Sequence, residues 1–463
     1  MDHLSRAPLR RQLAAFGRQA LVDRLHAVRA LSQARGLQYL DDNSRPRTID
    51  LALVPWILTS AQVAFFRQVA TTLASALLRL PTLYAHDPAV RRIVPFDPVQ
   101  ESWIRLTQTP RARPLAVIGR LDSTATFDHA PWRQSFEMLE PNAVGVGGVH
   151  YAPTACSIIL DVLGDVLERA FPHQRIVPMP DPRALLMDEF RWVATRLRRR
   201  LRRVALIENV DYTTGTDEFG QLARYLTRQG LEALVVDPRQ FQWSRGRLLA
   251  RGREIDLLYR DCELSEFVEM EESGRRLVAL RRAIQEGRLI SGLIWEFDQK
   301  SAWELFTDSR YAHYFTPGQR RLFRAHLPWT RLVRQARVSD WRGRTVDLVP
   351  VIRRHQSTLV LKPNTLYGGE GVVVGRTVSR SVWDATLRAA LRGRTPHVVQ
   401  RLARIHTERF PMLDRGRPRE VERSVVSGFF FNSVNVGLVG RFSADPVVNV
   451  SRGGGLLSAL MVQ

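Results

Sequence analysis

One segment of the chain combines a lysine with three closely spaced glycines. Residues 357–375 read STLVLKPNTLYGGEGVVVG, so a β-rich run ends at Lys362 and a turn with Gly368, Gly369 and Gly371 precedes a second apolar run. Glycine lets the backbone approach a phosphate closely and point N–H groups at it, and the lysine adds positive charge. The pattern predicts strand, glycine-rich loop and strand, which is not the strand–loop–helix of a P-loop. The alternative is an ordinary tight hairpin.

Lysine is almost absent from this chain. Lysine and arginine together number 68, and two of these are lysines, Lys300 and Lys362. A lysine carries a compact charge on a thin stem that suits a narrow phosphate cleft, whereas a guanidinium is wide and planar. Lys300 begins a predicted helix, where a cation gains nothing from the helix dipole. We therefore expect both lysines to face a ligand, the alternatives being chance retention and a solvated position.

Polar side chains also end two neighbouring predicted strands. Arg120 and Asp122 end the run PLAVIGRLD, and Glu140 and Asn142 follow the short strand predicted at 136–139. Carboxylate and amide oxygens are hard ligands of the type that Mg²⁺ takes beside nucleotide phosphates. The pattern therefore predicts a magnesium site where the two strands meet, and the alternative is that Pro141-Asn142 is simply a turn.

The remaining pattern favours an α/β chain. Apolar spacing predicts helices within 5–35 and over 61–80, 154–170, 182–201 and 267–286. Residues 203–262 alternate strand, helix and strand and then form a predicted hairpin, as in an open α/β domain. The run LISGLIWEF is predicted to be a strand that leads directly to Lys300.

The composition narrows the classes of protein. A formal charge of +22 and a pI of about 11.2 invite a nucleic-acid interpretation. The arginines are spread along the whole chain, however, and the densest run, at 196–203, lies on a predicted helix, so we rank nucleic acid low among partners. Two cysteines, Cys156 and Cys262, do not make a disulfide framework or a zinc site. Without a membrane-spanning run or a secretory signal layout, the expected location is the cytoplasm.

Four segments together resemble a known family. LVLKPNTLYGGEGVVVG, LPWTR at 327–331, the junction at Lys300 and VVNVSRGGG resemble the circularly permuted ATP-grasp proteins of the type 2 group. Glutathionylspermidine synthetase and the eukaryotic-type glutathione synthetases are more distant relatives with the same layout. In an ordinary ATP-grasp chain the lysines precede the metal carboxylates, and the reverse order here agrees with the permutation.

This resemblance implies roles for individual residues. The lysines and the glycine turn would contact the nucleotide phosphates, and Gln400 would lie next to the adenine. The implied nucleotide-binding residues are Lys300, Lys362, Tyr367, Gly368, Gly369, Gly371 and Gln400. The implied Mg²⁺ ligands are Asp122, Glu140 and Asn142. Arg120 would lie beside the reacting carboxylate, and Arg452 would hold anionic oxygens as charge develops.

The resemblance also implies a fold and an activity. The expected fold is α/β: a circularly permuted ATP-grasp with an inserted open α/β subdomain and an N-terminal helical region. The expected parts are a mainly helical region (1–110), a metal-ligand half with helices (111–200), a substrate-side α/β subdomain (201–285) and a nucleotide-binding half (286–463). The expected activity is ATP- and Mg²⁺-dependent joining of a small carboxylate to an amine through an acyl phosphate. The alternatives are another phosphoryl transfer, ATP binding alone, and nucleic-acid binding.

Overall fold

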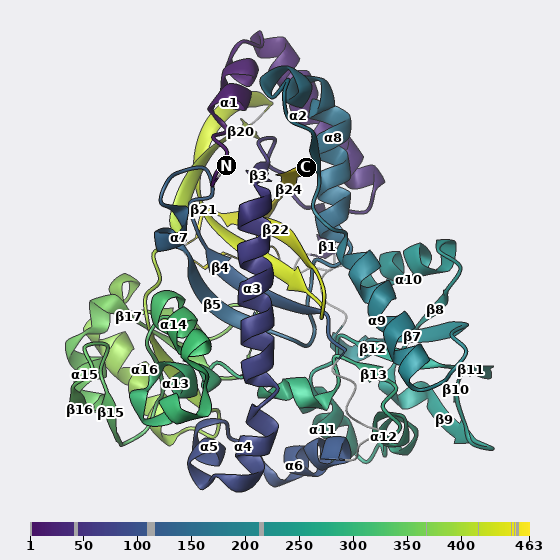
Figure 1. Cartoon of the computed structure of the whole chain (residues 1–463), viewed down its shortest axis with the longest axis vertical. Helices are drawn as coiled ribbons and strands as arrows, with labels where there is room; N and C mark the ends of the chain where they lie inside the picture. The colour runs from purple at the N-terminus through teal and green to yellow at the C-terminus, as the bar shows by residue number, and fades with distance from the viewer. Residues whose placement is uncertain are drawn as a thin grey trace.

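The computed structural model describes residues 2–40, 45–108, 116–212, 217–366, 368–414, 416–445, 447–448, 450 and 453–463. The fold is mixed α/β. Figure 1 shows a roughly triangular outline in which helix α3 (Ser60–Leu77) runs up the middle. A green lobe lies at the lower left and a teal lobe at the right, and strands from both halves of the chain lie behind α3.

The central sheet joins strands that are distant in sequence. Its antiparallel order is β23–β22–β21–β4–β5, and β20 pairs with β21 outside that path. The strands are β4 (Gly119–Thr124), β5 (Glu137–Asn142), β20 (His406–Asp414), β21 (Arg417–Phe431), β22 (Val436–Ser443) and β23 (Gly455–Leu457). The pairing of β4 with β21 therefore places the 120–142 region beside the C-terminal part of the chain.

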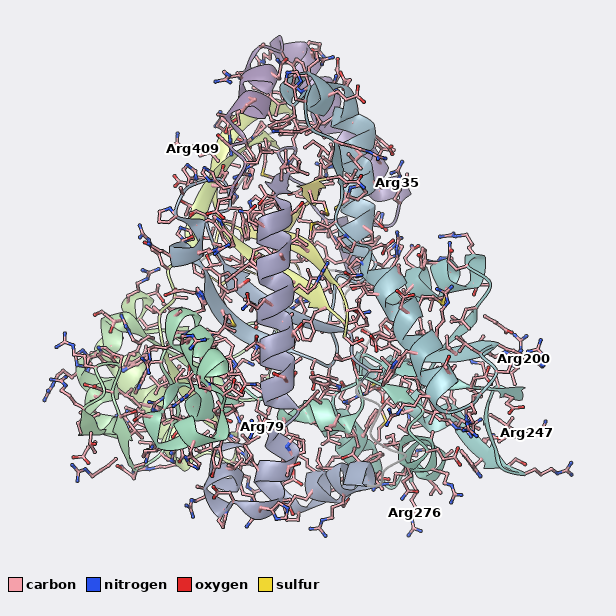
Figure 2. The ribbon with its side chains drawn as sticks, in the orientation of Figure 1. Arg35, Arg79, Arg200, Arg247, Arg276 and Arg409 are labelled. Atoms are coloured by element: carbon pink, nitrogen blue, oxygen red, sulfur yellow. The ribbon has the colours of Figure 1, made fainter. Side chains whose placement is uncertain are left out.

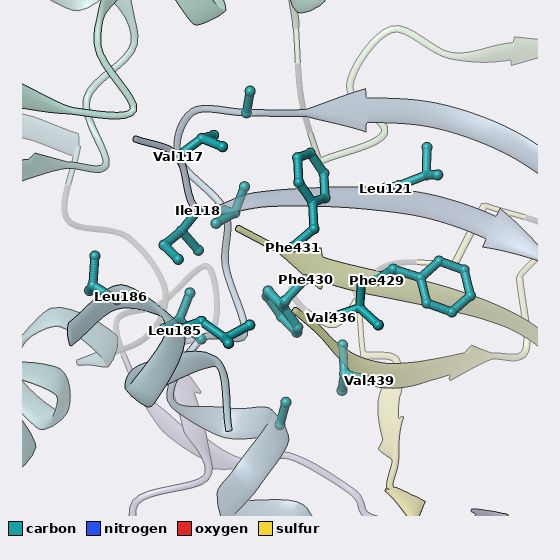
Figure 3. Close-up of a cluster of buried hydrophobic side chains, with 14 of the residues drawn as sticks. Val117, Ile118, Leu121, Leu185, Leu186, Phe429, Phe430, Phe431, Val436 and Val439 are labelled. Atoms are coloured by element: carbon teal, nitrogen blue, oxygen red, sulfur yellow. The ribbon is translucent and has the colours of Figure 1, made fainter. Parts of the chain in front are cut away.

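The end of β21 is buried on both faces of this sheet. Successive strand residues point to opposite faces, and Phe429, Phe430 and Phe431 are all at most 1% exposed. Figure 3 shows Phe430 and Phe431 on opposite sides of the strand, with Leu185 of α9 (Pro182–Arg196) on the side of Phe430. On the other face, Phe66 of α3 stacks on Phe429 with ring centroids 3.9 Å apart. Covered on both faces, the sheet is a rigid base for the side chains of β4 and β5.

Helix α3 belongs to a long apolar helical segment. Thr59 and Gln62 form a capping box at its start, and the helix packs against β21 and β22. Together with α4 (Leu80–His86), it spans Ser60–His86, the one helical segment in the described ranges long and apolar enough to cross a membrane. Of its 18-residue apolar window, 44% is buried. Its apolar face is therefore used in the core, where Phe66 lies.

The green lobe is built on a second antiparallel sheet, of order β14–β19–β17–β18. Its strands are β14 (Thr330–Leu332), β17 (Leu359–Pro363), β18 (Val373–Val374) and β19 (His397–Arg401), with a small β15–β16 hairpin (Arg337–Ser339, Thr345–Asp347). Its helices are α13 (Ala302–Thr307), α14 (Pro317–His326), α15 (Leu348–Arg354) and α16 (Arg380–Arg392). A separate apolar cluster that includes Trp329, Leu361 and Trp383 fills this lobe. The predicted strand–loop–strand around the glycines is present as β17 and β18.

The teal lobe contains the predicted open α/β unit. Its parallel sheet has the order β13–β12–β7–β8, and the predicted hairpin is the small β9–β10–β11 sheet. The strands are β7 (Arg203–Ile207), β8 (Glu232–Val236), β9 (Phe241–Ser244), β10 (Arg247–Ala250), β11 (Arg253–Glu254), β12 (Leu257–Arg260) and β13 (Leu289–Ile290). The helices are α10 (Glu218–Arg228), α11 (Leu264–Glu272) and α12 (Val278–Gln285). The alternation predicted over 203–262 is therefore confirmed.

Four local predictions were wrong. The strand predicted at 136–139 continues to Asn142 as β5, so Glu140 and Asn142 lie within the strand and do not follow it. The helix predicted over 267–286 is two helices, because Gly274 adopts a φ of +87° between α11 and α12. The run LISGLIWEF forms only the two-residue strand β13 and then a 3₁₀ helix, Leu293–Asp298. Ser291, with a φ of +50°, ends the strand and bonds through its N–H to the carbonyl of Ala116. Helix α9 ends at Arg196, because Arg198 has a φ of +52°.

Residues 7–34 lie at the upper end of the molecule and residues 80–104 at its lower end (Figure 1). The remaining helices are α1 (Ala7–Ala14), α2 (Arg18–Ala34), α5 (Pro88–Ile93), α6 (Pro98–Ile104), α7 (Trp132–Ser135) and α8 (Tyr151–Ala170). The remaining strands form a β1–β2 pair (Gln38–Leu40, Pro46–Thr48) and the sheet β3–β24–β6 (Trp56–Leu58, Ala459–Val462, Ile176–Pro178). Strand β24 thus ties the C-terminal residues to the N-terminal region.

Candidate functional site

A cavity of about 400 Å³ lies between the central sheet and the green lobe. Most of the site residues predicted from sequence line it, from segments that are far apart in the chain. These are Arg120, Asp122, Glu140, Asn142, Lys300, Lys362, Gly368, Gly369 and Gln400. Gly371 is in the same turn but does not line the cavity. Two predicted site residues, Tyr367 and Arg452, lie outside the described residues.

The two lysines lie on neighbouring segments of the green lobe. Lys362 Nζ donates to Gln400 Oε1 at 2.8 Å, and Gln400 in turn donates to Thr330 Oγ1 at 3.0 Å. Lys300 Nζ donates to the carbonyl of Leu366 at 2.7 Å and lies 3.6 Å from Glu140 Oε2. Burial lowers the pKa of Lys362 from its ordinary value. A half-buried ammonium that lines a cavity is available to an anionic ligand.

Asn364, which the sequence analysis did not single out, joins the two lysine segments. Its side-chain oxygen accepts from the Ser301 N–H at 2.8 Å, and its side-chain nitrogen donates to Gln299 Oε1 at 2.8 Å. The backbone N–H of Lys300 donates to the Asn364 carbonyl. With only 1% of its surface exposed, Asn364 holds Lys300 in register with the end of β17.

The glycine turn needs glycine for two reasons. Gly368, Gly369 and Gly371 all have φ between +66° and +75°, a region that other residues rarely adopt. A Cβ at Gly369 would also lie 2.6 Å from Val447 Cγ1, and one at Gly371 would lie 2.7 Å from Pro363 Cγ. The turn therefore packs closely between β17 and the C-terminal part of the chain.

Strand pairing brings the predicted metal ligands together. Asp122 of β4 is opposite Glu140 of β5, and Arg120 is opposite Asn142, with a β-bulge directly after Asp122. Side chains of directly paired residues lie close on one face of a sheet. Glu140 and Asn142 thus face the cavity on the side where Lys300 reaches Glu140.

The surroundings of Asp122 differ from those of Glu140 and Asn142. Its Oδ1 accepts from Arg120 Nε at 2.8 Å, and its Oδ2 lies 2.7 Å from Nη2 of Arg441 on β22. Burial opposes ionisation, but Arg120 and Arg441 outweigh it and lower the pKa of Asp122. Sequence reasoning missed Arg441, because nothing in the local pattern VGRFS distinguishes it from the other arginines.

The residues present fit a magnesium ion in part. Among the described residues, no group of three or more His, Cys, Asp and Glu side chains is arranged to hold a metal ion. Glu140 and Asn142 supply one carboxylate and one amide, and the amide nitrogen of Asn142 points to Asp122 at 3.4 Å, so its oxygen is turned elsewhere. Mg²⁺ is commonly bound by one or two carboxylates together with water and substrate phosphates. The donor set therefore suits an ion completed by a phosphate ligand.

A glycine-containing loop after β5 forms another wall of the cavity. Glu218 of α10 accepts from the N–H groups of Gly148 and His150 at 2.8–2.9 Å and is 8% exposed. Burial raises the pKa of Glu218 from an ordinary 4.5 to about 7. The Glu218 carboxyl group therefore joins the teal lobe to the loop at 145–150.

The raised pKa of Glu218 predicts how stability depends on pH. Protonated Glu218 is favoured in the folded chain, so the free energy of unfolding should fall as pH rises from 4.5 to 7. Glu218→Gln should remove that fall, and above pH 7 the variant should be more stable than wild type by up to about 3 kcal/mol. Urea unfolding at pH 5 and pH 8 measures both. An unchanged pH dependence in the variant would show that Glu218 does not titrate in this way.

Comparison with known proteins shows the fold. No protein-family model matches the chain, and no curated protein matches it. A glutathione synthetase-like effector from Globodera pallida, solved in its apo form, aligns with a TM-score of 0.61 and 10% sequence identity. The alignment covers 96% of this chain and 98% of the effector. The chain therefore has the fold of this glutathione synthetase-like protein.

Two further solved structures are similar at a lower level. A candidate γ-glutamylcysteine synthetase from Methylobacillus flagellatus aligns with a TM-score of 0.36 and 13% identity, over 84% of this chain and 87% of that chain. A RimK-domain ATP-grasp protein from Sphaerobacter thermophilus aligns with a TM-score of 0.25 and 13% identity, over 54% of this chain and 91% of that chain. At these TM-scores neither alignment adds to the argument about the fold.

Proposed function

We propose that the protein is an ATP- and Mg²⁺-dependent ligase that joins a carboxylate to an amine in a circularly permuted ATP-grasp site. One observation carries the proposal. The only two lysines of the chain, Lys300 and Lys362, line the same cavity as Glu140, Asn142 and Arg120, although the two groups come from distant segments. Cations for a triphosphate, oxygen ligands for a hard metal and an arginine for a carboxylate are the groups that this reaction needs.

The nucleotide would lie between the central sheet and the β14–β19–β17–β18 sheet of the green lobe. Lys362 and Lys300 would neutralise phosphate charge, and the turn at Gly368 and Gly369 would place backbone N–H groups over the β- and γ-phosphates. Gln400, on the neighbouring strand, holds Lys362 through its side-chain oxygen. Mg²⁺ held by Glu140 and Asn142 would offset the remaining phosphate charge.

The proposed reaction has two steps. An oxygen of the substrate carboxylate attacks the γ-phosphorus, the bond to the β,γ-bridging oxygen breaks, and ADP leaves an acyl phosphate behind. The amine nitrogen then attacks the acyl carbon, phosphate departs with the C–O electron pair, and the nitrogen gives up a proton. Arg120 in the cavity, with Arg452 as predicted from sequence, would stabilise the anionic oxygens as charge develops. Positioning supplies most of the acceleration in such a site.

Two alternatives make different predictions. A protein that only binds ATP, or performs another phosphoryl transfer, would use the same lysines without joining two substrates. A nucleic-acid-binding protein would bind in a way that weakens steeply with salt and ignores ATP. Figure 2 shows Arg35, Arg79, Arg200 and Arg409 at separate places around the molecule, so the positive charge is distributed over it. That distribution counts against the nucleic-acid alternative, which predicts a clustered basic face.

The decisive experiment is ATP consumption measured against pooled amino acids and pooled polyamines, with mass spectrometry of the products. The ligase predicts phosphate release that depends on both an acid and an amine, and a product whose mass is their sum less water. ATP hydrolysis or binding that no pool stimulates would favour the first alternative. Binding to nucleic acid that ATP does not change would favour the second.

A further inference from the structure

Three charged side chains meet on the face of the central sheet that borders the cavity. Arg120 and Asp122 come from β4, and Arg441 comes from β22 on the far side of β21. The residue of β21 that pairs with Asp122 is Gly428. A Cβ at Gly428 would lie 2.8 Å from Arg120 Cδ and 3.2 Å from Asp122 Oδ1. A glycine at this point therefore leaves the space in which the three side chains meet.

Asp122 holds both arginines at once. Oδ1 accepts from Arg120 Nε at 2.8 Å, and Oδ2 accepts from Arg120 Nη2 at 3.2 Å and lies 2.7 Å from Arg441 Nη2. The side chains of Arg120 and Arg441 are each 14% exposed, and the side chain of Asp122 is 5% exposed. Glu140 and Glu218 also attract Arg120, and Glu140 attracts Arg441, from a greater distance. Among the described residues, Asp122 is the one carboxylate within ion-pair distance of either guanidinium, so both arginines can take a further anion.

The arginines keep hydrogen-bond donors that this carboxylate does not use. Arg120 also donates through Nη1 to the carbonyl of Gly147 at 2.6 Å. Nε of Arg441 is buried and has no hydrogen-bond partner among the described residues. A buried donor without a partner is rare in folded proteins and points to a missing ligand or water. Both arginines line the cavity, so an anion there can reach them.

We propose that Arg120 and Arg441 form one oxyanion-binding pair and that Asp122 is the positioning residue that holds them. The pair would take a planar carboxylate or a phosphoryl group, because guanidinium matches both with parallel N–H donors. That the anion is the acid substrate, bound where it is activated, rests on the proposed function. The other source of the same chemistry is the γ-phosphate of ATP. In this arrangement the oxygens of Asp122 serve the arginines, and Glu140 and Asn142 are left for the metal.

The experiment uses simple anions and no nucleotide. The thermal unfolding midpoint of the full chain is measured with sodium acetate and with sodium phosphate, each against sodium chloride at equal ionic strength. A bound anion raises the midpoint in proportion to its occupancy, so the series yields an apparent affinity. We expect both anions to raise the wild-type midpoint above that in chloride. In Arg441→Lys and Arg441→Met, the apparent affinity for acetate should fall about tenfold or more.

Two further variants separate the sites. Arg183→Lys is the matched control, because Arg183 pairs with Asp181 at 2.7 Å outside the cavity and should keep both anion effects. In Lys362→Ala the acetate effect should persist. Loss of only the phosphate effect in that variant would assign phosphate to the lysines and carboxylate to the arginines, as proposed.

Three results would overturn the proposal. One is a wild-type midpoint that responds to acetate and phosphate only as it does to chloride. Another is an Arg441→Met variant whose unfolding midpoint in sodium chloride is lowered but whose response to acetate equals that of wild type. That result would show that Arg441 has only a structural role. The third is an acetate effect lost in Lys362→Ala and kept in Arg441→Met. Since no ATP is turned over, a failure of the ligase proposal would leave this result standing, and the reverse also holds.

Discussion

Replacing Lys362 by alanine should reduce ATP turnover by about 10²- to 10³-fold, the usual cost of removing one preorganised group that faces developing charge. Lys362→Arg should recover little of this loss. The lysine Nζ lies 2.8 Å from Gln400 Oε1, and Gln400 is 3% exposed and already donates to Thr330. A wide planar guanidinium does not fit where a point charge on a thin stem does. Phosphate release under saturating substrates measures the effect.

A control variant and a chemical-protection experiment accompany this test. Arg344→Ala is a suitable control, because Arg344 is in the same lobe, pairs with Asp340 and has a side chain 64% exposed. It should keep wild-type turnover. Since Lys300 and Lys362 are the only lysines, acetylation with an amine-reactive ester followed by mass spectrometry reports on each, and Mg·ATP should protect both. Wild-type turnover in Lys362→Arg, or acetylation indifferent to Mg·ATP, would refute the assigned role.

Glu140→Gln should lower turnover by about 10²-fold or more and raise the Mg²⁺ concentration needed for half-maximal activity. The substitution keeps the shape of the side chain and removes one negative charge. Glu140 is 27% exposed and lies 3.6 Å from Lys300 Nζ, so the fold should hardly depend on that charge. High Mg²⁺ should rescue the variant partly at best. A titration of ATP hydrolysis against Mg²⁺ measures both quantities.

The same strand supplies a matched control. Glu137 is also in β5, accepts from the Arg404 N–H and does not line the cavity, so Glu137→Gln should titrate like wild type. Asp122→Asn gives a useful contrast. If Asp122 positions arginines, turnover should fall while the Mg²⁺ dependence stays near that of wild type. If the Mg²⁺ dependence of Glu140→Gln equals that of wild type, Glu140 does not bind the metal.

Local patterns predicted the parts of the site that depend on neighbours in sequence. The β17–β18 hairpin follows from a β-rich run broken by three glycines, and their positive φ values are a local backbone requirement. The pairing of Asp122 with Glu140 follows from two short strands close in sequence. The failures were also local in origin. LISGLIWEF has the composition of a buried strand, but Ser291 bonds instead to Ala116, a distant residue that the pattern does not contain.

By itself, the sequence determined which chemical groups were available: two ammonium groups in a chain of arginines, a glycine turn beside one of them, and oxygen ligands on two short strands. These follow from residue type and spacing, which act over a few residues. The tertiary structure decided which groups meet. Arg441 reaches Asp122 only because β21 pairs with β4 on one edge and β22 on the other, with Gly428 between them. Long-range strand pairing brings together side chains from distant segments, and no local pattern encodes such a pairing.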